Sequence, residues 1–345
     1  MTRASSVASF VLVTTALLAL GGTAAHAAGR DPKAAMLAAA RSKYPDTTTS
    51  IYEHGTSTST LYSQGCSAGA AAQNGVVILD FGRPAERSNN YGTIDFNGNF
   101  DTDSDILTGM EQFAQGYHDC LSTGSSAKVS IARGTNNSCS NDDKVCCPKS
   151  CGSQPYSFYS AGKSWATWVD RLQSFISSNG WKAHETASAA DDAEPAWDPP
   201  TTTTDQFLSG FAARFGSTYP MWDYGSLEPG YWSSSQEYQV AYGYAPDVPF
   251  PEIYGSTNAQ QWESLDKWAV ANEGHAMTIW GVTSEYNYGS GYNCGLTAHQ
   301  AYDAMLSQLQ SDPSTYQSSI TYVTDIPCNT AFDAADRTIE RGPPG

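Results

Sequence analysis

The chain has 345 residues and carries 35 acidic against 18 basic side chains, a formal net charge of −17. This excess of negative charge repels phosphate backbones and anionic surfaces, so we expect no nucleic-acid partner. Uncharged glycans stay open as ligands. The 9 Trp and 20 Tyr include the kind of ring that stacks on a sugar face, although most such rings belong in the core.

Residues 1–27 have the pattern of a secretory signal. Arg3 supplies a positive start, Phe10 to Leu20 is a short apolar run, and Ala25-His-Ala27 matches an A-x-A cleavage site. The run is too short to cross a membrane, which takes about 20 apolar residues, and no other stretch approaches that length. We therefore expect a secreted, extracellular monomer with no membrane association after cleavage.

All eight cysteines follow the predicted signal. An even number in an exported chain indicates disulfides, with about 105 possible pairings. Four of them crowd into Cys139–Cys151, where the lack of C-x-x-C spacing and of a nearby His favours a disulfide-stapled loop over a metal site. Proximity in sequence makes Cys294–Cys328 a candidate pair. The cysteines are Cys66, Cys120, Cys139, Cys146, Cys147, Cys151, Cys294 and Cys328.

Residues 28–74 are small and polar, and we expect an N-terminal extension with one helix near 34–42. Within it, Gly65-Cys-Ser67-Ala-Gly69 fits the G-x-S-x-G elbow of serine hydrolases. That elbow requires a buried strand before it and a helix after it. Because Thr56–Ser63 is polar, the interpretation that we favour is a turn, with a nucleophilic Ser67 as the alternative.

From residue 75 onward, strands and helices alternate. Val76–Phe81 is an apolar run typical of a buried strand, and Trp165–Ser178 carries an apolar stripe at helical spacing with Gly180 beyond its end. The predicted strands are 76–81, 127–133, 182–192, 219–224, 238–242, 276–282 and 319–325, with an eighth near 156–160 or 251–254. The predicted helices are 105–121, 165–178, 203–215, 259–271 and 297–310.

This alternation predicts an α/β fold, a (β/α)8 TIM-like barrel, formed by residues 75–345 as a single domain with disulfide-stapled loops. The sequence contains neither G-x-G-x-x-G nor G-x-x-x-x-G-K-[ST], so a nucleotide-binding fold lacks a motif. Active sites of such barrels lie where the strands end. Polar residues expected there are Asp80, Arg133 with Asn136 and Asn137, Asp192, Glu194, Asp223, Tyr242, Glu285 and Asp325.

Asp192 and Glu194 lie two residues apart in this set. On an extended strand their carboxylates share one face, about 6.5–7 Å apart along the chain, and Pro195 ends the strand. Glycoside hydrolysis uses two carboxylates at such a separation. The alternative for each acid is an ordinary loop residue whose carboxylate accepts a hydrogen bond from a backbone N–H.

With these residues in place, the chain resembles glycoside-hydrolase-like barrels related to family 25 lysozymes. The resemblance rests on the order of four motifs: Leu79-Asp-Phe81, Asp192-Ala-Glu194, Tyr238-Gln-Val-Ala-Tyr242 and Val323-Thr-Asp-Ile326. The chain also resembles exported bacterial glycoside-hydrolase-like proteins of unassigned function, through Pro251-Glu-Ile-Tyr254 and Arg133-Gly-Thr-Asn-Asn-Ser138.

The resemblance implies a secreted glycoside hydrolase that acts on a polysaccharide or on peptidoglycan. It implies Glu194 as the general acid, covered by Trp197, and Asp192 as an ionised carboxylate that stabilises the transition state. Asp80 and Asp325 would orient the sugar or a water molecule. The implied substrate-binding residues are Asp80, Tyr242, Asp325, Trp197, Glu252 and Glu285.

Two other functions stay open. One is a catalytically inactive barrel that serves as a glycan-binding or interaction module, because a fold does not fix a function. The other is a calcium-dependent protein, because acids alternate in Asp95–Asn99 and Asp101–Asp105. The glycine and glutamate of an EF-hand loop are missing there, which favours a solvated loop before a helix. The histidines show no metal-binding spacing, so we expect no metal and no cofactor.

Overall fold

The computed structural model describes residues 43–138, 157–286 and 295–327. The predicted signal, the helix near 34–42, the cysteines of 139–151 and the Cys294–Cys328 pair lie outside these residues. Among the described residues, none of the helices combines the length and the apolar character needed to cross a membrane.

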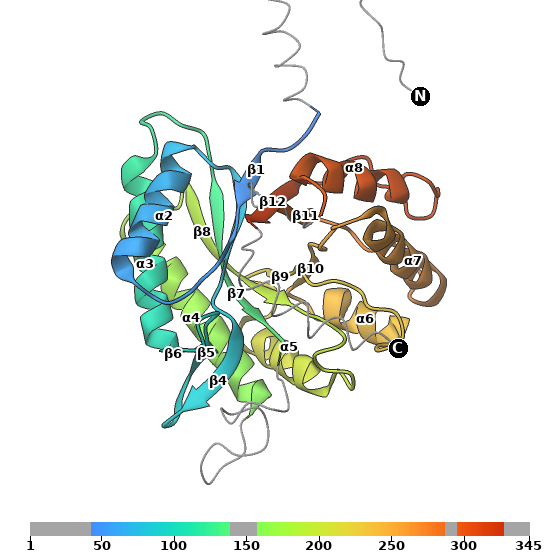
Figure 1. The fold of residues 1–345 in the computed structure, drawn as a ribbon, viewed down its shortest axis with the longest axis horizontal. Coiled ribbons are helices and arrows are strands. Elements are labelled where there is room, and N and C mark those ends of the chain that lie inside the picture. The colour runs from blue at the N-terminus through green and yellow to red at the C-terminus, as the bar shows by residue number, and fades with distance from the viewer. Residues whose placement is uncertain (1–42, 139–156, 287–294, 328–345) are drawn as a thin grey trace, which may run out of the picture. The chain divides into compact units, whose positions relative to one another are not determined.

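Parallel strands form the centre of the fold (Figure 1). One sheet has the order β1-β12-β11, and a second has the order β10-β9-β8-β7-β3-β2. Their bounds are β1 Thr47–Thr49, β2 Ile51–Tyr52, β3 Gly75–Asp80, β7 Val129–Asn136, β8 Glu185–Asp192, β9 Met221–Asp223, β10 Asp247–Pro249, β11 Gly281–Tyr286 and β12 Tyr322–Pro327.

Backbone hydrogen bonds also join the edges of the two sheets. On one side, the N–H of Ser50, between β1 and β2, donates to the carbonyl of Asp325 at 2.9 Å. On the other side, Glu252, just after β10, bridges Thr283 of β11 in parallel register, and the N–H of Ile253 donates to the Thr283 carbonyl at 2.9 Å. Each edge of the larger sheet is therefore hydrogen-bonded to the smaller one.

Helices alternate with the strands along the chain and surround them in Figure 1. They are α2 Thr58–Ala70, α3 Asp103–Cys120, α4 Phe158–Ser178, α5 Thr202–Phe215, α6 Ser234–Tyr238 with the π-helical turn η1 Gln239–Gly243, α7 Ser256–Asn272 and α8 Ala298–Leu309. An antiparallel sheet of β4 Arg83–Arg87, β5 Asn90–Ile94 and β6 Phe100–Thr102 is inserted between β3 and α3.

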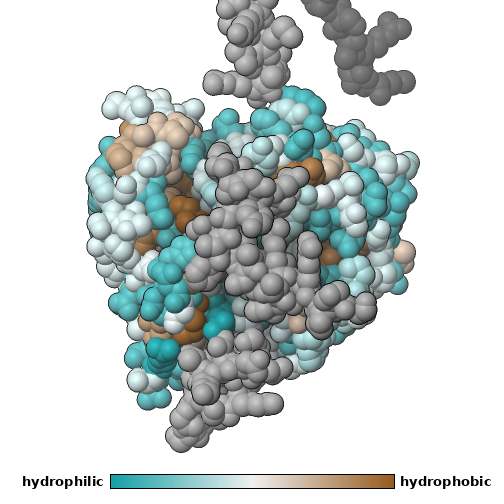
Figure 2. All heavy atoms as spheres, viewed as in Figure 1, coloured by the Kyte–Doolittle hydropathy of each residue, from teal (hydrophilic) through white to brown (hydrophobic). Residues whose placement is uncertain are grey.

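Alternate residues of the strands enter different cores, because successive strand side chains point to opposite faces. Val77 and Leu79 of β3 belong to a core that includes residues of α2, α3 and α4, whereas Val76 and Ile78 belong to a core built from residues of strands and strand ends. All four are fully buried, as expected of a strand covered on both faces. Figure 2 shows mainly hydrophilic residues on the coloured surface.

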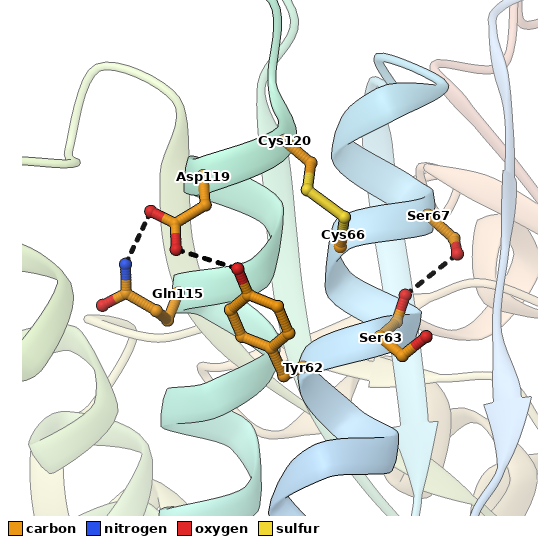
Figure 3. Close-up of a disulfide and its surroundings, with 7 residues drawn as sticks. All are labelled: Tyr62, Ser63, Cys66, Ser67, Gln115, Asp119 and Cys120. Atoms are coloured by element: carbon orange, nitrogen blue, oxygen red, sulfur yellow. Dashed lines mark hydrogen bonds between the residues drawn. A yellow bond between two sulfur atoms is a disulfide. The ribbon is translucent and has the colours of Figure 1, made fainter.

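Helices α2 and α3 lie side by side (Figure 3), and glycines allow their close approach. A Cβ on Gly65 of α2 would overlap with the carbonyl of Phe113 in α3, so only glycine permits this approach. The Cys66–Cys120 disulfide joins the same helices, and the Tyr62 hydroxyl donates to Asp119 at 3.1 Å. The Cys66–Cys120 bond confirms the predicted disulfide formation for one pair of cysteines, and it is the one disulfide among the described residues.

The G-x-S-x-G segment lies within the C-terminal half of α2, so the prediction of a turn was wrong. The Ser67 hydroxyl donates to the carbonyl of Ser63 at 2.9 Å, within the helix. The glycines of the segment serve helix contact and not an elbow. Residues 28–74, expected to be an extension, also contain β1 and β2, which pair with β12 and β3.

The predicted strand at 238–242 was also wrong, because these residues form the end of α6 and η1. Ser233 begins α6 with a capping box, and Tyr238 and Tyr242 then lie one turn apart with their ring centroids at 5.8 Å. Residues four positions apart lie on one face of a helix, so the spacing of Tyr238 and Tyr242 fits a helix as well as a strand. The strand suggested at 251–254 contains only the isolated bridge from Glu252 to Thr283, and β10 lies just before it; the other suggested strand was wrong, because Phe158–Ser160 begins α4. Strand β11 starts at Gly281, later than the predicted 276.

Candidate active site

Buried acids collect at the carboxyl ends of the parallel strands. Asp192 ends β8, and Glu194 follows it after one residue. Five of these acids, which we call the acidic cluster, are each at most 5% exposed. They are Asp80, Asp192, Glu194, Glu252 and Glu285. The structure brings together the predicted pair and Glu252, and the charges of Asp80 and Glu285 act on the same tyrosine, Tyr52, as those of Asp192 and Glu252.

The strand alternation directs Asp192 into this cluster. Ala187 and Ala189 of β8 contribute to the core against the helices, and Ala190 contributes to the core among the strands. Asp192 has the same parity as Ala190, so it faces the strand side. Oxygen atoms of Asp192, Glu194 and Glu252 all lie within 4.8 Å of one another.

Glu194 is held by its carboxylate and by its backbone. The N–H and the hydroxyl of Ser226 donate to its two carboxylate oxygens at 3.0 and 2.8 Å. The Asn137 side chain accepts the Glu194 N–H at 2.9 Å and donates to the Glu194 carbonyl at 3.0 Å. Two neighbouring segments thus fix the position of one side chain, which is the support that a reactive group needs.

Asn137 is itself fixed by the start of α5. Its amide donates to the Thr204 hydroxyl at 3.1 Å, and that hydroxyl donates to the Asp198 carboxylate at 3.0 Å. The same Asp198 oxygen accepts the backbone N–H groups of Thr203 and Thr204 at 2.9 Å. The N-terminus of α5 therefore anchors Glu194 through Asn137.

The acids in the cluster oppose one another's ionisation. Burial raises the pKa of Asp192 well above its usual range, and the neighbouring carboxyl groups raise it further, foremost Glu252 and then Glu194. Groups this close and this buried do not all ionise without a counter-charge, which favours the protonated form of Asp192. A carboxyl group that keeps its proton near neutrality is what general acid catalysis requires.

Three tyrosines border the cluster, the buried Tyr224 and the partly buried Tyr52 and Tyr254, and none of them was among the predicted site residues. The Tyr224 hydroxyl donates to Asp80 at 2.7 Å. Burial and the charges of Glu252 and Glu285 raise the pKa of both Tyr52 and Tyr254 well above the usual range. Their position at strand ends was the one available signal among 20 tyrosines.

Two predicted members lie elsewhere. Tyr242 is in η1, with its ring 5.9 Å from that of His275, so its expected place at a strand end was wrong. Arg133 points to the helix side of β7, where it pairs with Asp103 at 2.5 Å and lies 3.6 Å from the centre of the Trp165 ring. This ion pair is a buried structural contact between β7 and α3.

The remaining predicted residues stay near the strand ends. Asp325 accepts the Ser284 hydroxyl at 2.6 Å, and burial raises its pKa. Burial likewise raises the pKa of Asp223 to about 7. Trp197 is half-buried and closes a turn in which its N–H donates to the Glu194 carbonyl at 3.1 Å.

Asp192, Glu194 and Glu252 form the one group of the described residues that could hold a metal ion, and three carboxylates suit a hard cation such as Ca²⁺. The acidic loop considered for calcium is different. Asp95 accepts the N–H groups of Asn97 and Asn99, and Asp105 forms the capping box of α3. That loop therefore uses its carboxylates to order its own backbone.

No protein-family model matches this chain, and no curated protein matches it. Among solved structures, a protein from Labrenzia alexandrii DFL-11, described provisionally as a mandelate racemase/muconate lactonizing enzyme, matches 84% of this chain with a TM-score of 0.40 and 9% identity. This chain spans 57% of that protein's length. The GH26 domain of an endo-β-mannanase/endo-β-glucanase from Prevotella bryantii matches 89% of this chain and 91% of its own, with a TM-score of 0.37 and 12% identity. Similarity at this level carries no argument about activity, and the relation to family 25 lysozymes stays a prediction.

Proposed function

We propose that the chain is a secreted glycoside hydrolase that acts on a polysaccharide or a cell-wall glycan and that its strands close into one (β/α)8 barrel. The hydrogen bonds of Ser50 and Ile253, which join both edges of the two sheets, support closure of the barrel. The alternation of strands with helices supports it as well. Secretion is proposed from the signal pattern of residues 1–27.

The observation that carries the activity is the buried pair of Asp192 and Glu194, whose oxygens lie within 4.8 Å of each other. Glycosidases that retain the anomeric configuration place two carboxyl groups about 5–5.5 Å apart, and inverting enzymes place them about 6.5–9.5 Å apart. A nearest approach of their oxygens within 4.8 Å is compatible with the retaining route, which we adopt here: one carboxylate attacks the sugar and the other exchanges a proton.

The hydrogen bonds support an assignment of roles opposite to the one that the resemblance implied. Glu194 receives two hydrogen bonds from Ser226, which stabilise an ionised carboxylate, whereas burial and its neighbours keep the proton on Asp192. In this proposal Asp192 protonates the leaving oxygen. Glu194 attacks the anomeric carbon, and water then releases the sugar.

The test incubates the full chain with a panel of neutral, acetylated and cationic polysaccharides and with peptidoglycan, and measures new reducing ends. We expect Glu194→Gln and Asp192→Asn each to lower the rate at least a hundredfold at an unchanged melting temperature. Glu185→Gln, a change of a buried acid at the opposite end of β8, serves as the matched control.

The roles separate on a substrate with a good leaving group, such as an aryl glycoside. Such a substrate needs little protonation, so Asp192→Asn should regain activity there and Glu194→Gln should not. The reverse pattern would restore Glu194 as the acid. Binding of a glycan without cleavage would instead favour the binding module.

A further inference from the structure

The acidic cluster holds more carboxyl groups than hydrolysis needs. Two carboxyl groups suffice for the reaction, and Glu252, Glu285 and Asp80 lie beside them. Asp80 is engaged by the Tyr224 hydroxyl and by the N–H of Gly82, at 2.7 Å each. Neutral sugars do not require such a concentration of negative charge, whereas a cation does.

A second observation comes from Asp192. Its side-chain atom Oδ1 is buried and has no hydrogen-bond partner among the residues that the structure describes. Asp192 as a whole is 5% exposed, and it faces the oxygens of Glu194 and Glu252. A buried polar atom without a partner is rare in a protein, and a ligand with N–H or O–H groups would satisfy it.

The position of Glu252 indicates which part of a ligand carries the charge. Its oxygen lies within 4.8 Å of both Asp192 and Glu194. These two side chains would act at the anomeric carbon, and the substituent next to that carbon is the one on C2 of the same sugar. Glu252 is 3% exposed and its charge acts on Tyr52 and Tyr254, and an ion pair is stronger at a buried carboxylate than in water.

We propose that the acidic cluster recognises the ammonium group of a 2-amino-2-deoxy sugar, with Glu252 as the main ion-pair partner. The substrate class is then a polysaccharide with free amino groups, such as a polymer of glucosamine or galactosamine. Cleavage of this polysaccharide rests on the proposed hydrolase function, whereas binding of the amino sugar does not. An acetylated amine carries no charge and is larger, so the site should discriminate against it.

Binding is measured by calorimetry on the full chain carrying Glu194→Gln, so that cleavage does not interfere. The probes are glucosamine and galactosamine oligomers, each with its fully N-acetylated counterpart. We expect at least tenfold tighter binding of one free-amine oligomer than of its acetylated counterpart, and weaker binding at high salt. Adding Glu252→Gln should abolish the preference, whereas adding the control Glu185→Gln should preserve it.

Equal affinity for free and acetylated oligomers would overturn the proposal, and so would a preference that survives Glu252→Gln. Melting temperatures show whether each variant folds, and Glu285→Gln replaces Glu252→Gln if that variant does not. A separate titration with Ca²⁺ addresses a metal site. Binding of Ca²⁺ that depends on Asp192 and Glu252, with no amino-sugar preference, would assign the cluster to a metal ion instead.

The outcomes also separate this proposal from the hydrolase. Cleavage of neutral or acetylated glycans without any preference for free amines would refute the amino-sugar site and leave the hydrolase intact. Tight binding of a free-amine oligomer that wild type never cleaves would refute the hydrolase and leave the amino-sugar site intact.

Discussion

Glu185 should make the protein less stable as the pH rises. It lies at the start of β8 with 1% exposure, and its carboxylate oxygens have no hydrogen-bond partner among the described residues. The nearest ionisable contact is Nδ1 of His118 at 3.8 Å. Burial, and secondarily the charge of Asp119, raise the pKa of Glu185 to about 8.

The sign follows from proton binding. In the unfolded chain Glu185 loses its proton near pH 4.5, and in the folded chain it keeps the proton to about pH 8. Between these values the folded state binds more protons, so the free energy of unfolding falls as the pH rises. Each pKa unit is worth about 1.4 kcal/mol, which gives a total loss of about 5 kcal/mol, of which about 4 kcal/mol is lost by pH 8.

The assay compares urea unfolding of wild type and Glu185→Gln at pH 5, 6.5 and 8. The variant has no charge to bury, so its advantage over wild type should grow to about 4 kcal/mol at pH 8. Glu273→Gln, an exposed change at the end of α7, is the control and should follow wild type. A constant difference between Glu185→Gln and wild type at all three pH values would refute the reasoning.

Three further predictions concern the contact between α2 and α3 and the residues that hold Glu194 in place. Replacing Cys66 and Cys120 by Ala should lower the free energy of unfolding by about 4 kcal/mol, because the disulfide closes a loop with a sequence separation of 54; urea unfolding measures this, and an unchanged midpoint would contradict it. Gly65→Ala should destabilise by about 1–3 kcal/mol through overlap with the Phe113 carbonyl, and an unaltered melting temperature would count against the close packing. Asn137→Ala should reduce turnover more than it raises KM, because it frees the Glu194 backbone; steady-state kinetics would contradict this if only KM changed.

The sequence predicted the elements whose pattern has a single structural solution. The apolar run of β3 formed within one residue of its predicted bounds, and the stripe of 165–178 lies in α4, which begins earlier, at Phe158. The strand of residues 47–52 was missed because its side chains are mostly hydroxyl groups. Thr48 and Ser50 are nonetheless fully buried, since Thr48 donates to the Val76 carbonyl and Ser50 bonds to Thr324 at 2.7 Å.

The candidate site could be predicted in part for a related reason. Asp192, Glu194 and Asp80 follow strands, and strand ends of parallel sheets converge, so their proximity was accessible from sequence. The contacts of Ser226 and Asn137 with Glu194 depend on how two loops meet, and no spacing along the chain encodes that meeting. Reactive residues such as Asp192 can therefore be predicted from sequence, whereas the residues that hold them in place are much harder to predict.

The pairing of β1 with β12 has a consequence for how the chain reaches its native state. Thr47 lies opposite Val323 in this parallel pair, so the first strand finds one of its neighbours only at the far end of the chain. Contacts over such separations form slowly, because a long loop must close before they stabilise anything. A ribosome must therefore have synthesised the chain as far as β12 before β1 can pair with it, and until then the unpaired edge of β1 stays open to unwanted association.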